Sequence, residues 1–207
     1  MLPVLTRNRF IEYKIFHNMA ATAATNGGTF ASDGTVGTIA IANASNATSS
    51  DNSYATAVLL LNEITNYLKV TNFGFTIPIH SKIDGITLEI ERNSTILNSV
   101  TDSTIRLVLP SGAFGSTNKS AGATWPNADA YATFGSSTDL WSETLRPIDV
   151  NDKNFGVAIS GAATLFAGTA QIDHVRITIN YTQLAMPHNI TRVVRVGNNM
   201  SRSETAK

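Results

Sequence analysis

The stretch QIDHVRITINYT, residues 171–182, decides how the chain folds. Val175, Ile177, Ile179 and Tyr181 alternate with polar residues along it. An alternation of period two predicts a β-strand with one face in a core and the other toward solvent. We therefore expect Ile177 and Ile179 to point inward, and the polar side chains between them to point outward, in an antiparallel sheet.

An acid and a histidine, Asp173 and His174, stand side by side at the head of this strand. A catalytic site would also need a nucleophile held by the histidine and a third group to orient it. No serine of the chain stands in the G-x-S-x-G pattern of a nucleophile elbow. By the alternation, His174 belongs to the outward face and Asp173 to the strand edge, so we assign no catalytic residue.

Similar strand signals recur along the chain. Residues 86–92, ITLEIER, place Ile86, Leu88 and Ile90 on one face and Thr87, Glu89 and Glu91 on the other. Further strands are predicted at 54–61, 67–75, 104–109 and 155–160, with a single helical turn within 60–68. Many short strands must pack as two sheets or close into a barrel, and we expect an all-β, jelly-roll-like antiparallel sandwich.

The 207 residues suffice for one core flanked by arms. Residues 20–37 are small and Gly-rich, which is typical of a linker, and Pro187 interrupts strand pairing near the other end. We divide the chain into an N-terminal arm and linker (1–28), a β-sandwich domain (29–185) and a C-terminal arm (186–207).

Charge is unevenly distributed along this neutral chain. Residues 1–25 hold three Lys or Arg against one Glu, +2, and residues 186–207 hold four against one, +3, so the remainder carries −5. Basic arms on an acidic body favour contacts with another molecule, although exposed tails also simply collect charge. Zero net charge and a longest apolar run of only 57–61 predict neither a nucleic acid nor a membrane as partner.

The arms are the predicted partner-binding segments. Phe10, Tyr13 and Phe16 stand in an apolar N-terminal arm, and Arg192 and Arg195 in the basic C-terminal arm. An apolar arm in water favours aggregation unless it is covered, so we expect its own body or a neighbouring copy in a homo-oligomer to cover it. The alternative is that residues 10–16 add one more strand to their own sandwich.

Five stretches, in their order and spacing, resemble a β-sandwich domain found in phage virion proteins. They are SDNSYATA (50–57), TNFGFTIP (71–78), IDGITLEIER (83–92), STDLWSETLRPIDVNDKNFGVAIS (137–160) and IDHVRITINYT (172–182). The likeness covers residues 50–182 and leaves out both ends. It implies a structural or binding module, in which Asp173 caps a turn and His174 bonds a neighbouring strand.

The function expected from this resemblance is that of a phage virion structural protein, a head decoration or cement protein assembled in the host cytoplasm. It would contact other virion subunits through its arms, and it would not be an enzyme. The first alternative is a tail or fibre adhesin that binds host glycans through Trp125 and Tyr131, which stand in a Gly-rich aromatic loop. The second is a glycan hydrolase, but Glu89 and Glu91 share one outward strand face and form no facing pair.

No cofactor or metal is predicted. The four histidines are far apart in sequence, and the chain has no cysteine and no H-E-x-x-H pattern. Loop carboxylates could hold calcium, but without EF-hand spacing we interpret them as solvated acids: Asp51, Asp84, Asp139, Asp149 and Asp152. Trp141 and Phe134 are expected to close one end of the sandwich.

Overall fold

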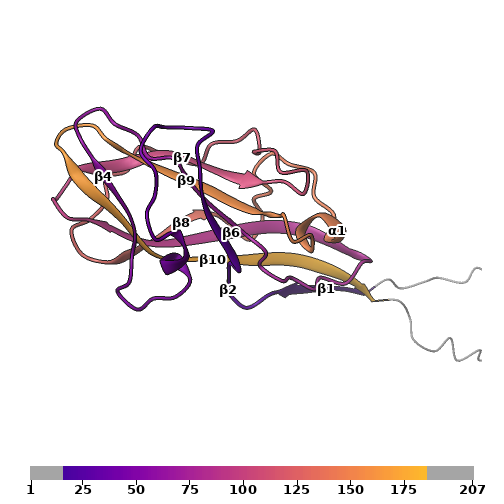
Figure 1. Ribbon diagram of the computed structural model, residues 1–207. Coiled ribbons are helices and arrows are strands. Elements are labelled where there is room, and N and C mark those ends of the chain that lie inside the picture. The colour runs from indigo at the N-terminus through magenta and orange to yellow at the C-terminus, as the bar shows by residue number, and fades with distance from the viewer. Residues whose placement is uncertain (1–15, 186–207) are drawn as a thin grey trace, which may run out of the picture.

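The computed structural model describes residues 16–185, which form two antiparallel sheets packed face to face (Figure 1). The larger sheet has the order β1-β10-β6-β8, and β2 and β4 also pair with β10. The smaller sheet has the order β3-β5-β9-β7. The predicted antiparallel β-sandwich is confirmed.

The strands of the larger sheet are β1 (Phe16–Ala21), β2 (Thr25–Asn26), β4 (Ala55–Leu59), β6 (Ser81–Ser94), β8 (Ala130–Gly135) and β10 (Gly168–Ala185). Those of the smaller sheet are β3 (Thr29–Asp33), β5 (Tyr67–Thr71), β7 (Val100–Val108) and β9 (Gly156–Ala163). Two one-turn helices, η1 (Ala44–Ala47) and α1 (Pro147–Val150), lie in connections. The helical turn predicted within 60–68 is wrong, because a non-helical turn and β5 occupy this segment.

The core lies between the inner faces of the sheets. Val175, Ile177 and Ile179 of β10 are fully buried, whereas Arg176 and Thr178 keep part of their surface. The predicted faces of this strand are therefore confirmed. The facing layer comes from alternate residues of the smaller sheet: Leu68, Val70, Ile105, Leu107, Val157 and Ile159.

A break in the register explains the polar residues at the head of β10. Ile172 pairs with Arg92 and His174 with Glu91, so Asp173 is an extra residue that β6 does not match. Such a bulge exchanges the faces of the strand, because side chains alternate with a period of two. As a result, Ile172 and Val175 both point into the core although three positions separate them.

The domain boundary near residue 28 is wrong. β1 pairs with β10 from Phe16↔Ala185 to Ala21↔Asn180, and β2 pairs with β10 at Thr25↔Ile177. Phe16, assigned to a partner-binding arm, therefore stands in the sandwich itself. The physical reason is the length of β10, since an edge without β1 and β2 would leave its backbone groups unpaired. Phe10, Tyr13, Arg192 and Arg195 lie outside the described residues.

Candidate functional site

Asp173 and His174 fasten two distant segments to the larger sheet. The Asp173 carboxylate accepts hydrogen bonds from the backbone N–H groups of Asp51, at 3.4 Å, and Asn52, at 3.2 Å. The Tyr131 hydroxyl lies 2.7 Å from Nδ1 of His174, and Oδ1 of Asn26 lies 2.9 Å from Nε2. The expected roles of a turn cap and of a link to neighbouring strands are confirmed by these contacts.

His174 is on the outward face as predicted, but it is not exposed to solvent. Only 6% of its surface is accessible, because the segment before β4 covers it and Thr48 forms a bridge to its backbone. Burial, followed by the charge of Arg176, lowers the pKa of His174 and favours the neutral ring. A neutral ring donates from Nε2 to Asn26 and accepts from Tyr131 at Nδ1, so both nitrogens are engaged in structural contacts.

Trp125, predicted as a glycan contact, is buried with 1% of its surface accessible, so this prediction is wrong. Its Nε1 donates to Oδ1 of Asp102 at 2.9 Å. Arg92 forms an ion pair with the same carboxylate, with Nη2 at 3.0 Å from Oδ2, and its guanidinium lies 5.1 Å from the centroid of the Trp125 ring. Trp125 is buried because this charged pair between the two sheets gives its indole both a hydrogen bond and a stacking partner.

Tyr131 stays at the surface, with 38% of its area accessible. Its hydroxyl is bonded to His174, and the Arg176 guanidinium lies 4.3 Å from its ring centroid. Arg176 is itself held by two hydrogen bonds to the Glu89 carboxylate, at 2.9 and 3.0 Å. One face of the ring is therefore covered, and only the rest of Tyr131 can meet a ligand.

Trp141 is buried in the core, and Phe134 packs against that core. The Trp141 indole donates to the backbone oxygen of Ile86 at 3.1 Å.

The five loop acids form hydrogen bonds or ion pairs with nearby residues. Asp51 and Asp152 accept backbone hydrogen bonds two residues ahead, and the others bind a lysine or arginine: Asp84, Asp139 and Asp149. Among residues 16–185, no three His, Cys, Asp or Glu side chains are grouped so as to hold a metal ion.

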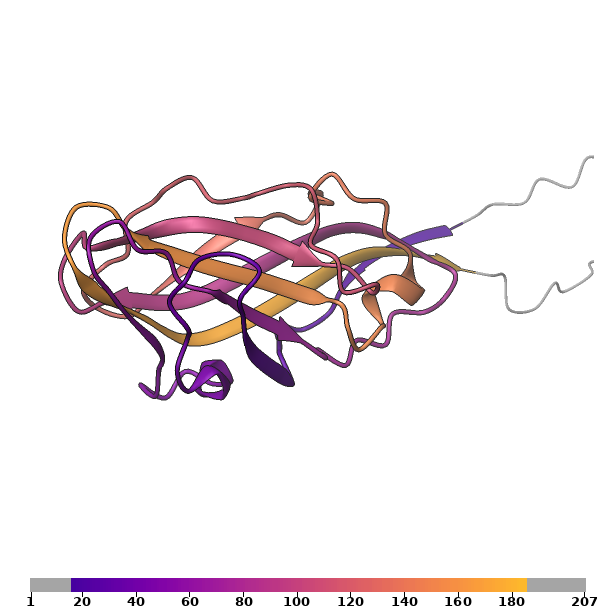
Figure 2. The same ribbon diagram turned by 45° about the horizontal axis from the view of Figure 1, so that its top comes forward.

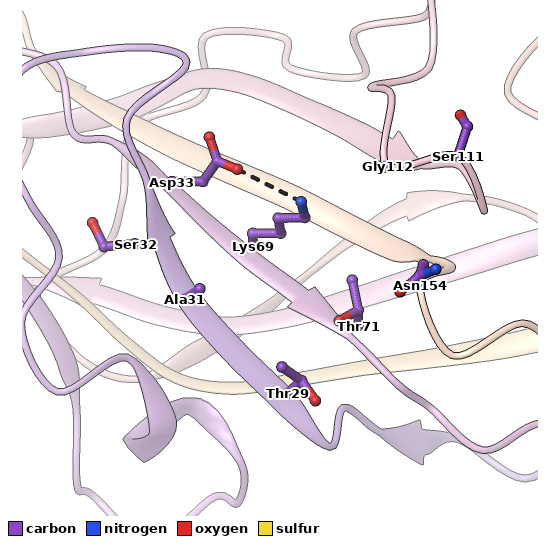
Figure 3. A pocket seen from close by; sticks show the side chains of 9 residues that line it. All are labelled: Thr29, Ala31, Ser32, Asp33, Lys69, Thr71, Ser111, Gly112 and Asn154. Carbon is purple, nitrogen blue, oxygen red and sulfur yellow. Dashed lines mark ion pairs between the residues drawn. The ribbon is translucent and has the colours of Figure 1, made fainter.

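A shallow groove of about 460 Å³ lies on the outer face of the smaller sheet (Figure 3). Its lining is mostly polar and comes from β3, β5 and two loops: Thr29, Ala31, Ser32, Asp33, Lys69, Thr71, Ser111, Gly112 and Asn154. Lys69 Nζ lies 3.6 Å from Oδ2 of Asp33 and 5.8 Å from the ring centroid of Phe114. Hydrogen bonding to Thr35 holds the pKa of Asp33 below its usual value, so this pair stays charged and mutually neutralised.

A cluster of exposed apolar side chains lies at one end of the sandwich, and we call it the apolar tip. It consists of Leu60, Leu61, Ile96, Leu97, Leu165 and Phe166, each with more than half of its surface accessible. The six residues form three pairs of sequence neighbours, and each pair stands in one loop. Backbone hydrogen bonds tie these loops together: the N–H of Asn62 donates to the carbonyl oxygen of Ala163, and the N–H of Thr95 donates to that of Thr169. The apolar tip lies at the opposite end from the start of β1 and the end of β10 (Figures 1 and 2).

The strand alternation could not reveal the apolar tip, because it lies in connections. The available signal was a pair of large apolar residues in each of three turns, where small polar residues are usual. No sequence pattern indicated the groove, because β3 was not predicted and the other lining residues come from distant parts of the sequence.

Comparison with protein-family models, with curated proteins and with solved structures finds no match for this chain. No helix of the described residues is long and apolar enough to cross a membrane. Any assignment of function therefore depends on the arrangement of this chain's own residues.

Proposed function

We propose that this chain is a structural protein of a phage virion, located on the particle exterior as a head decoration or cement protein. In this proposal it is not an enzyme, and it joins other subunits through its two ends. The observation that carries the proposal is the pairing of Phe16 with Ala185. The first strand thus begins beside the end of the last strand, and residues 1–15 and 186–207 are attached at the same end of the sandwich (Figure 1).

Charge supports a joining role for this end. Residues 1–15 hold Arg7, Arg9 and Lys14 against Glu12, a sum of +2, and residues 186–207 sum to +3. Residues 16–185 hold eight Lys or Arg against thirteen Asp or Glu, a sum of −5. Basic segments attached at one end would be attracted to an acidic neighbouring subunit, and charge complementarity of this kind orients partners on approach.

The body supports the proposal as a scaffold of two sheets packed around one core. About half of the residues in the stretches that resemble phage virion domains lie on β4, β6, β9 and β10, whose inner faces form the core. They also include Asp173, which fastens the loop before β4. The resemblance therefore concerns the scaffold, and it leaves the ends and surfaces to set the particular partner.

Particles purified from a host that carries the gene test this function. Antibodies raised against the folded protein should label intact particles in electron micrographs, and mass spectrometry should find the chain among the particle proteins. Label on the head is the expected result. A chain that stays entirely in the particle-free fraction would overturn the proposal.

A tail or fibre adhesin that binds a host glycan is the alternative, and the groove on the smaller sheet is the observation that favours it. Hydroxyl, amide and charged side chains line this groove, and such groups form the hydrogen bonds that fix a polar ligand. Label on the tail, together with oligosaccharide binding that Asn154→Ala weakens and Asn127→Ala does not, would support the adhesin instead. Asn127 is the control because it is a loop asparagine outside the groove lining.

A further inference from the structure

Nothing among residues 16–185 covers the apolar tip, and the tip has no free charge. Its three loops, residues 60–66, 95–99 and 164–167, contain a single charged residue, Glu63. The Glu63 carboxylate accepts a hydrogen bond from the backbone N–H of Leu60 at 2.7 Å, so it is turned toward its own loop. Clusters of exposed large apolar side chains on soluble proteins usually mark a place where another molecule binds.

The sequence before β1 has the matching chemistry. Residues 2–15 contain seven large apolar side chains, with the densest part between residues 10 and 15: Leu2, Val4, Leu5, Phe10, Ile11, Tyr13 and Ile15. Apolar side chains of this kind could cover the tip. The question is whether they could come from the same chain.

The body is too long for residues 10–15, the densest part of this segment, to reach the apolar tip of their own chain. Phe16 pairs with Ala185 at one end of β10, and the apolar tip adjoins Gly168 at the other end. The 18 residues of β10 span about 55–60 Å at the usual rise of a strand. Phe10, six residues before Phe16, can lie at most about 20 Å from it even in a fully extended chain.

We propose that the apolar tip of one copy binds residues 2–15 of a second copy, so that copies join head to tail. This inference rests on the proposed role of the ends in joining subunits, and it names the surface that receives the N-terminal segment. The contact is heterologous, since it joins opposite ends of two copies, and it therefore builds either a closed ring or an open row.

Two other occupants of the apolar tip are conceivable, an anionic lipid surface and the apolar tip of a second copy. Charge favours residues 2–15 of a second copy over the lipid surface. Residues 1–15 carry +2 and the body of the receiving copy carries −5, so the two attract each other. Attachment to anionic lipid usually uses Lys or Arg beside the apolar residues, and the three loops contain neither. Contact between two tips would cover the tips but leave the apolar residues of 2–15 without a binding surface.

Sedimentation velocity of three full-length variants tests the contact. The tip variant is Leu165→Ser with Phe166→Ser, and the N-terminal variant is Phe10→Ser with Tyr13→Ser. The control is Ile148→Ser, because Ile148 on α1 is as exposed as Phe166, at 59%, but lies outside the tip. We expect wild type and control to form oligomers and both double variants to be monomers, with all four melting at similar temperatures. A monomeric wild type at its highest soluble concentration would overturn the proposal.

Mixing the two double variants separates this contact from its rivals. The tip variant keeps its N-terminal segment and the N-terminal variant keeps its tip, so the mixture should restore one contact and form pairs of copies but nothing larger. Oligomers of the N-terminal variant alone would indicate tip-to-tip contact instead. A lower melting temperature of that variant, with assembly retained, would place the segment on its own body. Vesicles of phosphatidylcholine and anionic phosphatidylserine that sediment wild type but not the tip variant would identify lipid as the occupant.

The two proposals can fail separately. Particle labelling without self-association would remove only the head-to-tail contact. Self-association without particle labelling would remove the virion assignment but keep the contact between copies.

Discussion

At the scale of single residues, His174 links β10 to β2 and β8 through the two nitrogens of its ring. Its pKa is lowered in the folded protein because burial disfavours the charged form. The unfolded chain therefore takes up a proton at a higher pH, near its ordinary value of about 6.5. The stabilisation from neutral His174 is complete above that pH, and it is lost as the pH falls toward the folded-state pKa.

Replacing His174 with Gln should lower the free energy of unfolding by about 1–2 kcal/mol at pH 8, because buried hydrogen bonds are weakened. This difference from wild type should shrink between pH 8 and pH 5, since only wild type carries the titrating ring. Urea unfolding of both proteins at each pH measures the difference. The pKa of Asp173 is raised by burial, so its own contribution weakens as the pH rises, but both proteins share this effect. A difference that stays constant with pH would contradict the assignment.

Arg92 and Asp102 form a buried ion pair between the two sheets. Burial lowers the pKa of Arg92 and raises that of Asp102, while their mutual attraction opposes both shifts. Arg92→Met should lower the free energy of unfolding by about 3–5 kcal/mol, because Asp102 is left charged and unpaired. Adding Asp102→Asn should recover most of that loss in thermal and denaturant unfolding, since Asn is neutral and still accepts from Trp125. A double variant as unstable as Arg92→Met would instead assign the cost to lost packing.

Trp125 shows why single residues were the hardest part to predict. A tryptophan in a Gly-rich loop gives no local sign of its environment. Its acceptor, Asp102, lies 23 residues earlier in the chain, and the stacked Arg92 comes from the opposite sheet. The contacts that bury it depend on the packing of two sheets, which no local pattern contains. Asp173 was easier, because an acid before an apolar run often caps a turn.

At the scale of elements, β6 and β10 were predictable because alternation requires one buried face. The predicted inward residues, Ile86, Leu88 and Ile90, are all fully buried. The lengths of these strands were not predictable. β10 runs from Gly168 to Ala185, whereas the alternation extends only from 174 to 182, because the bulge at Asp173 breaks the period near the start of the strand.

A pair of substitutions checks this register. Ile177→Ala should cost about 2–5 kcal/mol, since it removes a buried side chain from the core. Thr178→Ala should cost less than about 1 kcal/mol, because this neighbour faces outward. Chemical denaturation of both variants gives the comparison. A larger loss for Thr178→Ala would mean that the two faces are exchanged.

At the scale of the whole molecule, β10 organises the larger sheet. β6 pairs along nearly all of one edge, and three short strands cover the other: β4 at residues 168–172, β2 at 176–177 and β1 at 180–185. Length and composition predicted one sandwich with attached ends. They could not place the N-terminal boundary, because β1 and β2 form by pairing with β10, which comes from the other end of the chain.

Two N-terminal deletions test this boundary. Removing residues 1–15 should leave the melting temperature nearly unchanged, because β1 stays paired with β10. Removing residues 1–21 should lower it and promote aggregation, since the backbone of residues 180–185 loses its partner and a bare strand edge pairs with other chains. Thermal melting with light scattering distinguishes the two, and the 1–15 deletion is the control for the loss of the N-terminal segment itself. Equal melting temperatures would show that β1 contributes nothing to the fold, whereas unfolding of the shorter deletion would place residues 1–15 within the sandwich's own core.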